Sequence, residues 1–361
     1  MIKKFDEVFV DKTRLGKKIP KEEYKKKGKY IIIDQGKDKI AGFTDNEDGI
    51  FTDVPTIIFG DHTRIIKYID KPFFLGADGV KVLKSKINNA NYKYLYYALK
   101  AAYIPNTGYN RHFKWLKKVS INYPSFEKQK RIVKLLDNLS EVKNKKNEEL
   151  KLCDTLIKAR FVEMFGSIQD NSKYSYKKIS DLTQVLSGGT PKRDVKKYWN
   201  NGKIPWIKTT ELKNNRITKS EESITELGLQ NSSAKQVPAH TILIAMYGQG
   251  KTRGMTGYLE IEATTNQACA CILPTSKINS EYLWQFLIMS YEILRNMAKG
   301  GNQPNLNSNL IKNFQILVPP KSEQNEFTSF VQQVDKSKVA IQKSLDETQI
   351  LFDSLMQKYF S

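Results

Sequence analysis

The feature that most constrains the fold is a repeat of one long segment at an offset of 195 residues. The stretch 123–139 reads YPSFEKQKRIVKLLDNL, and the stretch 318–334 reads VPPKSEQNEFTSFVQQV. The same offset relates Pro124 and Pro319, Gln129 and Gln324, Leu150 and Leu345, Leu156 and Leu351, and Phe165 and Phe360. This period is far too long for a solenoid repeat. The chain therefore contains two copies of one unit, each a globular segment followed by a long helix.

The two repeated stretches predict helices over about Ser125–Phe165 and Lys321–Phe360. Apolar residues of the first recur at spacings of three and four or their sums, as in a coiled-coil seam: Ile132, Leu136, Leu139, Val142, Leu150, Cys153, Leu156 and Phe161. A polar stretch, Lys143–Glu149, interrupts them. A helix of about 40 residues extends roughly 60 Å and must bury its apolar stripe. Its own copy is the expected antiparallel partner, which makes Cys153 a core residue.

These helices divide the chain into four segments. We expect a first globular segment at 1–124, the first helix at 125–166, a second globular segment at 167–319 and the second helix at 320–361. The polar stretch Gly166–Tyr174 lies at the boundary between the two copies. Helices and short strands in each copy predict the α+β class.

Short strands and one helix are expected in each globular segment. In the first we expect strands at Tyr30–Ile33 and Thr56–Phe59, a strand–turn–strand at 73–83, a helix at Tyr92–Ala101 and a strand at Trp115–Tyr123. In the second we expect strands at Ile204–Ile207, Thr241–Met246, Tyr258–Ile261, Thr264–Pro274 and Phe314–Val318, with helical stretches at Gly228–Val237 and Tyr282–Leu287.

The charge points to a polyanionic partner. The 361 residues carry a net charge of +21, while hydrophobic residues make up 40% and aromatic residues 11%. Such an excess attracts nucleic acid first and an anionic membrane surface second. No apolar run is long enough to span a bilayer, which weakens the membrane interpretation. Three cysteines without CxxC spacing indicate neither a disulfide framework nor a zinc site, so we expect a soluble cytoplasmic protein.

One motif resembles a nucleotide-binding loop. Ala245–Thr252 reads AMYGQGKT after an apolar strand. A true P-loop leads directly into a helix whose N-terminus holds phosphate, but here two further glycines and a strand follow. We therefore interpret the motif as the tip of a basic hairpin, on which Gln249, Lys251 and Arg253 offer donors to phosphates or base edges. An exposed hairpin without a ligand remains the alternative.

Other catalytic chemistry is sparse in this sequence. The three histidines form no metal-binding motif, no GxSxG elbow is present, and no clear GxGxxG follows a strand. We find no Asn/Asp-Pro-Pro-aromatic segment of the kind that a DNA amino-methyltransferase uses. The chain is therefore expected to bind and to space its partners, with no catalytic residue and no metal of its own.

Taken together, these features resemble the specificity subunit of type I restriction–modification systems. The resemblance rests on the two strand–Pro–x4–Gln–helix openings, LSGGTP at 186–191, TTNQACACILP at 264–274, FGDHTR at 59–64 and LGADGVKVL at 75–83. It covers essentially the whole chain. It implies two tandem α/β target recognition domains at 1–124 and 167–319, and two spacer helices that pair as an antiparallel coiled coil with pseudo-two-fold symmetry.

The resemblance also implies a function. Each recognition domain reads one half of a split, asymmetric sequence in double-stranded DNA. The helices set the gap between the half-sites and dock two methyltransferase (M) subunits. S-adenosylmethionine, ATP and Mg belong to the methyltransferase and restriction (R) subunits, so this chain is expected to hold no cofactor.

The expected DNA contacts follow from the loops of each copy. In the second domain they are Thr190, Lys192, Arg193, Gln249, Lys251, Arg253, Asn266 and Gln267. In the first domain they are Arg14, Lys17, His62, Thr63 and Arg64. The first copy has TRLGKKIP at 13–20 in place of the SGGTP turn and begins without the expected leader segment.

Two competing hypotheses remain. An NTPase or nuclease would use the AMYGQGKT loop. A coiled-coil scaffold would hold protein partners and bind DNA without regard to sequence.

Overall fold

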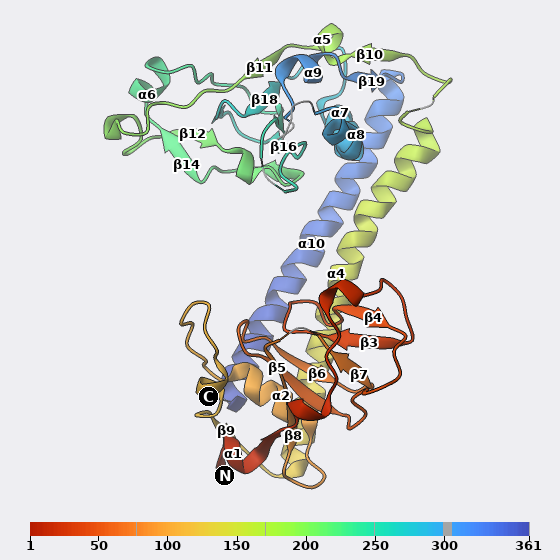
Figure 1. The fold of residues 1–361 in the computed structure, drawn as a ribbon. Coiled ribbons are helices and arrows are strands. Elements are labelled where there is room, and N and C mark those ends of the chain that lie inside the picture. Colours follow the sequence, from red (N-terminus) through yellow and green to blue (C-terminus); the bar gives the residue numbers. More distant parts are fainter. Residues whose placement is uncertain (77, 170, 249, 299–304, 361) are drawn as a thin grey trace. The chain divides into compact units, whose positions relative to one another are not determined.

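The computed structural model describes residues 1–76, 78–169, 171–248, 250–298 and 305–360. The chain divides into two compact units, which we call unit 1 (Met1–Glu149 with Ile341–Ser361) and unit 2 (Leu150–Ala340) (Figure 1). Each unit therefore holds one globular segment together with parts of both long helices.

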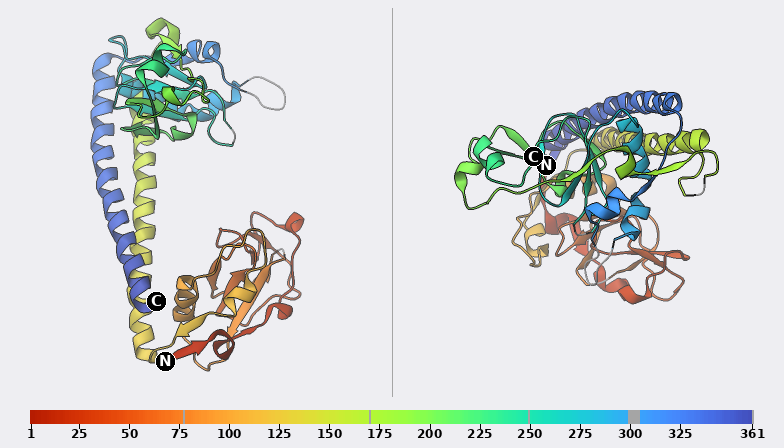
Figure 2. Two further views of the ribbon diagram at one scale, coloured as in Figure 1. Left: turned by 90° about the vertical axis from the view of Figure 1, so that its left-hand side faces the viewer. Right: turned by 90° about the horizontal axis from the view of Figure 1, so that it is seen from above.

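The two expected long helices are present. They are α4 (Phe126–Phe165) and α10 (Lys321–Phe360), each 40 residues long. Within unit 1, the Nζ atom of Lys143 donates to Oε1 of Gln349. Within unit 2, Lys338 Nζ donates to Asp154 Oδ1 at 2.8 Å, and Arg160 Nη2 donates to Glu326 Oε1 at 2.7 Å. The helices therefore run antiparallel in each unit, side by side in both views of Figure 2.

Apolar seam residues of both helices enter the core of each unit. In unit 1 these are Ile132 and Leu136 of α4 with Phe352 and Met356 of α10. In unit 2 they are Ile157, Phe161 and Phe165 of α4 with Phe327 and Val331 of α10. Cys153 is partly buried against the core of unit 2, as the seam predicts. Burial of these stripes stabilises helices that would be marginal alone.

The repeated Pro–x4–Gln motif fastens the start of each long helix. Gln129 and Gln324 are almost fully buried. Gln129 Nε2 donates to the carbonyl of Pro124 at 2.9 Å, and Gln324 Nε2 donates to the carbonyl of Pro319 at 2.8 Å. The amide thus ties the first turns of each helix back to the proline that precedes it.

The described residues of unit 1 form three small sheets. The first has the order β2 (Phe9–Asp11), β8 (Val80–Ser85), β5 (Thr56–Gly60) and β6 (Ile66–Ile69), all antiparallel. The second has the order β4 (Gly42–Thr44), β3 (Tyr30–Ile33) and β7 (Phe73–Leu75), with β3 and β7 parallel. A third pairs β1 (Ile2–Lys4) with β9 (Ser120–Asn122). The helices are α1 (Phe5–Val8), α2 (Tyr92–Ala101) and α3 (Phe113–Leu116), with short η1 (Thr13–Leu15) and η2 (Lys21–Glu23).

Unit 2 repeats this strand order. Its first sheet is β11 (Val185–Ser187), β18 (Cys269–Ile272), β15 (Ile242–Ala245) and β16 (Thr256–Leu259), extended by β13 (Asn215–Ile217). Its second is β14 (Glu222–Ile224), β12 (Ile204–Ile207) and β17 (Thr264–Thr265), and β10 (Tyr176–Lys178) pairs with β19 (Gln315–Leu317). The helices are α5 (Ile179–Leu182), α6 (Glu226–Gln230), α7 (Ser280–Met289), α8 (Tyr291–Asn296) and α9 (Ser308–Lys312), with η3 (Lys196–Tyr198) and η4 (Thr209–Glu211).

The internal repeat therefore includes the sheets as well as the long helices. The buried strands β5 and β15 are the two TIIF-like segments, and every residue of both is buried. The offset between copies grows along the chain, from 174 at Ile2 and Tyr176 to 195 at Ser120 and Gln315. Extra residues in the loops of the second copy account for this growth.

Two expected strands are wrong. Trp115–Tyr123 was expected to be extended, but it holds the end of α3 and only then β9, because Leu116 is buried and Lys117 N bonds locally to Phe113 O at 3.0 Å. Thr264–Pro274 is two strands in different sheets, β17 and β18. A turn at Asn266 separates them, with Cys269 N bonded to Asn266 O at 3.1 Å.

Two other elements differ in their bounds. The helical stretch expected at Gly228–Val237 is α6, which begins earlier because Thr225 caps it through Gly228 N and ends before Asn231. The strand expected at Tyr258–Ile261 is β16, shifted so that it pairs with β15. The two strands of 73–83 lie in different sheets.

Candidate nucleic-acid interface

In unit 2, a glycine pair leads the chain from β11 into the candidate interface. A Cβ atom on Gly188 would lie 2.1 Å from Thr265 Oγ1, and one on Gly189 would lie 2.3 Å from Ala234 N. Gly189 N donates to Thr265 O at 2.8 Å, and Gly189 O accepts from Trp206 Nε1 at 2.9 Å. Only glycine permits this close approach of backbones. The two glycines of the LSGGTP motif are thus required for close backbone packing. This packing fixes the position of the residues that follow them.

Three of the predicted contact residues meet just beyond these glycines. Thr190 Oγ1 donates to Oε1 of Gln267, and Asn266 stands next to Gln267 in the turn between β17 and β18. Asn266 N donates to Ile207 O at 3.0 Å, while its Oδ1 is buried and has no partner among the described residues. Gln267 is exposed. The exposed amide of Gln267 can pair with a base edge, as Gln does with adenine.

Arg193 is engaged within the domain. Its guanidinium lies 3.7 Å from the ring centroid of Trp199 and 4.6 Å from that of Trp206, and it forms an ion pair with Glu222. Hydrogen bonding from Arg193, and then from Lys208, lowers the pKa of the Glu222 carboxyl. The structure therefore gives Arg193 a bracing role between η3 and β14. Its neighbour Lys192 is exposed.

The basic hairpin tip is present between β15 and β16. The two strands pair antiparallel, with Ile244 opposite Thr256. Lys251 is exposed and Arg253 is half-buried, while Gln249 lies outside the described residues. After Lys251-Thr252 the chain turns into β16 and not into a helix, so the P-loop interpretation is not supported.

Helix α8 holds the backbone of this tip. Tyr291 donates through its hydroxyl to Lys251 O at 2.7 Å, and Arg295 Nη1 donates to Arg253 O at 3.0 Å. These bonds leave the Lys251 side chain exposed on an anchored backbone. Met246 N donates to Ala268 O at 2.8 Å, so the base of the tip adjoins the Asn266–Gln267 turn. The arrangement presents amide and ammonium donors along one edge of the domain.

In unit 1, the predicted His62, Thr63 and Arg64 occupy the tight turn between β5 and β6. Arg64 has a φ of 62° and its N–H donates to Gly60 O at 2.7 Å. The buried Asp61 accepts at Oδ1 from Phe113 N at 2.7 Å, and its carbonyl accepts from His112 N at 2.8 Å. Arg64 Nη1 donates to Ile104 O at 3.1 Å. The segment before α3 therefore braces this turn.

Gln35 joins this turn to two neighbouring loops. Its Oε1 accepts from His62 N at 3.1 Å, its carbonyl accepts from Thr63 Oγ1 at 2.6 Å, and its Nε2 donates to Asp78 O at 3.0 Å. The ring of His62 stacks on exposed Tyr109 with centroids 4.9 Å apart. Gly79 has a φ of 91°, and a Cβ there would lie 2.9 Å from His62 Cδ2.

Arg14 and Lys17 lie apart from the turn. Arg14 is exposed in η1, and Lys17 Nζ pairs with Asp48 Oδ2 at 2.9 Å. Within the described parts of the chain, no hydrogen bond or ion pair joins either residue to His62, Thr63 or Arg64. The first domain therefore has two separate basic regions, one at Arg14 and Lys17 and one at the turn His62–Arg64.

Several supporting residues were missed from the sequence. Gln35, Tyr109, Tyr291 and Arg295 are polar or aromatic residues in or beside loops, and no motif distinguishes them. Lys67 is also supporting: it is 6% exposed, and its Nζ donates to Asp34 O at 2.8 Å and Asp38 O at 2.6 Å. Burial lowers the pKa of this ammonium group. The alternating pattern of strand β6 could have indicated that Lys67 is buried.

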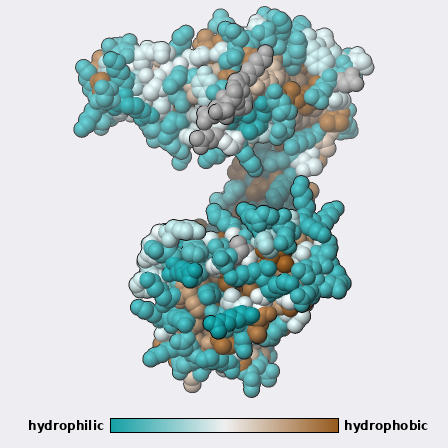
Figure 3. All heavy atoms as spheres, in the orientation of Figure 1, coloured by the Kyte–Doolittle hydropathy of each residue, from teal (hydrophilic) through white to brown (hydrophobic). Residues whose placement is uncertain are grey.

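The surface suits a polar ligand. Hydrophilic residues cover most of the globular surface visible in Figure 3. Among the described residues, no three His, Cys, Asp or Glu side chains come together as a metal site. None of the described helices has the length and apolar content needed to cross a bilayer.

Comparison with known proteins agrees with this geometry. A family model described as "Type I restriction modification DNA specificity domain" matches residues 1–152 and 171–349. The chain is 26% identical over 320 residues to the type I restriction enzyme EcoR124I/EcoR124II specificity subunit of Escherichia coli, covering 84% of this chain and 79% of that protein. It is 32% identical over 171 residues to the MjaIX specificity subunit of Methanocaldococcus jannaschii, covering 45% of this chain and 38% of that protein.

Solved structures share the fold. The crystal structure of a type I restriction–modification S subunit from M. genitalium matches with a TM-score of 0.63 and 19% identity, covering 100% of this chain and 96% of that one. A chain from a structure of type I R-M complex assembly matches with a TM-score of 0.57 and 16% identity, covering 100% and 97%. Because the family model spans both copies of the repeat, this chain belongs to the family of type I restriction modification DNA specificity domains.

Proposed function

We propose that this protein is the DNA-binding specificity subunit of a type I restriction–modification complex and reads a split, asymmetric target on double-stranded DNA. One observation carries the proposal: both units have the same strand order, but the loops at matching places differ. The turn after β5 presents His62 and Thr63, whereas the longer tip after β15 presents Lys251. One scaffold with two different reading surfaces suits two different half-sites.

The positive charge of the chain supports affinity for DNA but does not determine which DNA sequence is recognised. A net charge of +21 supplies phosphate contacts and a salt-dependent affinity. Amide groups such as that of Gln267 can add base readout. The sequence-independent scaffold hypothesis lacks a reason for the different loops of the two copies.

The long helices are proposed to set the gap between half-sites and to dock two methyltransferase subunits. Specificity subunits of this family are components of restriction enzymes, and one similar structure is described by complex assembly and conformational transition of the type I R-M system. In this proposal the chain is not itself an enzyme. S-adenosylmethionine, ATP and Mg are bound by the methyltransferase and restriction subunits.

The decisive experiment is a single-molecule methylome of the host with this gene intact, deleted, and restored. We expect deletion to remove one split motif methylated at adenine on both strands, and the restored gene to bring it back. A control strain lacking the partner methyltransferase gene should lose the same motif. If that control loses a motif that deletion of this gene leaves intact, the proposal is wrong.

A further inference from the structure

The internal repeat allows the two units to be compared residue by residue where α2 and α7 meet the long helices. Asn91 and Asn279 cap the two short helices. Tyr94 OH donates to Asn122 O at 2.5 Å, and Tyr282 OH donates to Leu317 O at 3.0 Å. These matching bonds place the two short helices in the same register, so that Tyr97 of unit 1 corresponds to Gln285 of unit 2.

The paired long helices correspond in the same way. Lys143 of α4 donates to Gln349 of α10 in unit 1, and Lys338 of α10 donates to Asp154 of α4 in unit 2. The offset of 195 relates Lys143 to Lys338 and Asp154 to Gln349. By the same offset, Ile157 of unit 2 corresponds to Phe352 of unit 1.

In unit 1 the junction is filled by aromatic side chains. The rings of Tyr97 and Phe352 lie with centroids 6.3 Å apart, and both residues are buried. Tyr97 OH donates to Asp137 Oδ1 at 2.8 Å. The aromatic pair occupies the space between the short helix and the helix pair.

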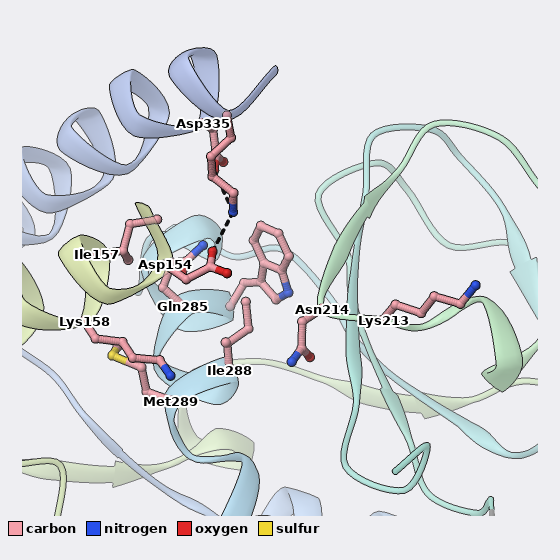
Figure 4. A pocket seen from close by; sticks show the side chains of 11 residues that line it. Asp154, Ile157, Lys158, Lys213, Asn214, Gln285, Ile288, Met289 and Asp335 are labelled. Atoms are coloured by element: carbon pink, nitrogen blue, oxygen red, sulfur yellow. Dashed lines mark hydrogen bonds and ion pairs between the residues drawn. The ribbon is translucent and has the colours of Figure 1, made fainter. Parts of the chain in front are cut away.

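In unit 2 the smaller Gln285 and Ile157 leave a pocket of about 310 Å³ at this junction (Figure 4). Trp284, Ile288 and Met289 of α7 form an apolar wall. Trp284 is held in place because its Nε1 donates to Thr256 Oγ1 at 2.9 Å. The pocket therefore coincides with the loss of this aromatic pair in unit 2 and with Lys213 and Asn214, which precede β13, a strand with no counterpart in the described sheets of unit 1.

The acidic groups of this pocket are already paired. Asp154 accepts from Lys338 at 2.8 Å. Asp335 pairs with Arg216 at 3.1 Å and with Lys338 at 3.8 Å. Lys158 and Lys213 also line the pocket, and neither forms an ion pair with any residue that the structure describes. Position 158 corresponds to Asp353 in unit 1, so a lysine at this position is found in unit 2 alone.

Two amides add hydrogen-bond donors. Asn214 Oδ1 accepts from Thr256 N at 2.9 Å and Thr256 Oγ1 at 3.0 Å, which leaves the Nδ2 amino group for the pocket. Gln285 is 5% exposed, and its amide has no hydrogen-bond partner in the described parts of the chain. The N–H bonds of this amide are therefore free to be donated to a ligand in the pocket.

We propose that this pocket binds a carboxylate, with the ammonium group of Lys158 and the amides of Asn214 and Gln285 as donors (Figure 4). Charge-assisted bonds of this kind are the strong ones in a partly enclosed site. The carbon chain that bears the carboxylate packs on Trp284 and Ile288. The carboxylate belongs either to an acidic side chain of a protein partner or to a free organic acid.

The first test uses the purified full chain and N-acetyl-glutamate N-methylamide as the probe, with the neutral glutamine analogue as its control. Signals of the Trp284 indole and the Gln285 amide are followed by ¹⁵N NMR. We expect saturable shifts with the glutamate probe and affinity for the glutamine probe about tenfold weaker, in line with the added strength of charge-assisted bonds.

Variants make the test specific. Gln285→Tyr with Ile157→Phe rebuilds the aromatic filling of unit 1 and should abolish binding while keeping or raising thermal stability. Lys158→Ala should weaken binding about tenfold without unfolding the chain, because it removes the unpaired charge. Lys235→Ala, at an exposed lysine outside the pocket, should change nothing. Equal binding of both probes, or no saturable shift with either, overturns the proposal.

A second measurement separates the two sources of the carboxylate. Binding of the chain to its methyltransferase subunits is compared with and without saturating glutamate probe, and for the filled variant. Competition, together with weaker assembly of the filled variant, identifies an acidic side chain of the partner. Unchanged assembly with intact probe binding identifies a free organic acid. Neither result depends on the DNA target, so this proposal can fail while the proposed function stands.

Discussion

Gln324 Oε1 accepts a hydrogen bond from the backbone N–H of Asn279 at 2.8 Å, while its Nε2 donates to Pro319 O at 2.8 Å. One buried side chain thus joins the start of α10 to the cap of α7. In unit 1, Gln129 makes the matching bond to Pro124 O, but its Oε1 has no partner among the described residues. The repeated glutamine therefore makes two side-chain hydrogen bonds in unit 2 and one in unit 1.

We therefore predict that Gln324→Met lowers the free energy of unfolding of unit 2 by about 2–3 kcal/mol, because it leaves a buried N–H and a buried carbonyl unpaired. Gln129→Met should cost unit 1 about 1 kcal/mol, since only one bond is lost. Urea denaturation followed by circular dichroism and tryptophan fluorescence measures both, and three of the four tryptophans lie in unit 2.

Gln333→Met is the matched control for this pair of variants, because Gln333 is exposed on the same helix. It should shift the unfolding midpoint little. Equal losses for Gln324→Met and Gln333→Met would show that the buried amide has no special role.

The cysteines should differ in reactivity. Burial raises the pKa of the Cys271 thiol to about 11 and raises that of fully buried Cys269 as well. Two units above an ordinary thiol correspond to about 100-fold less thiolate at pH 8, and the thiolate is the reactive form. We expect iodoacetamide to label the partly buried Cys153 in the folded chain and the other two only after unfolding. Peptide mass spectrometry over time measures this order, and early labelling of Cys269 would contradict the buried strand.

The long helices, the repeat and the central strands could be predicted because their signals are local and periodic. The apolar segments TIIF and TILIAM are buried as predicted, and so are Ile132, Leu136 and Phe161 of the helical stripe. Two other residues of that stripe, Val142 and Leu156, are exposed. Sheet membership could not be predicted in this way. The segment Thr264–Pro274 starts with four polar residues and is apolar after them. That its first part pairs with β12 and its second part with β15 depends on contacts far along the chain.

The DNA contacts themselves stay predictions. Residue type singled out Thr190, Gln267 and Lys251, which the structure places in loops, and it singled out Arg193 with equal strength. Only the folded chain shows that Arg193 stacks on Trp199 and pairs with Glu222. Supporting residues such as Gln35 bond to backbone groups of other loops. Such bonds depend on the fold and produce no recognisable sequence pattern.

The hairpin tip yields a prediction about DNA affinity. Lys251→Ala should weaken binding of the assembled complex to its target without changing stability, because the side chain is exposed and α8 holds only the backbone. If Lys251 meets a phosphate, the loss should be uniform across sequences and the salt slope should fall by about 1. Fluorescence anisotropy at several salt concentrations measures both quantities. Lys235→Ala serves as the control, and an identical loss for both variants would refute a specific role for the tip.

The helix pair yields the last prediction. Lys143, the first residue of the polar stretch, pairs with Gln349, and Asp154, which lies beyond the end of that stretch, pairs with Lys338. Deleting Asn144–Asn147 from α4 together with the facing Leu345–Thr348 from α10 therefore keeps both pairs while removing four residues from each helix. Four residues correspond to about 6 Å of helix, close to two base-pair steps of DNA at about 3.4 Å each. The methylome of a strain carrying this variant should show both half-sites unchanged and the gap between them shorter by about two base pairs. Deleting the four residues from α4 alone breaks the register of the pair and should reduce methylation at every site. An unchanged gap in the double-deletion strain, with methylation intact, would mean that the helices do not measure the distance between the half-sites.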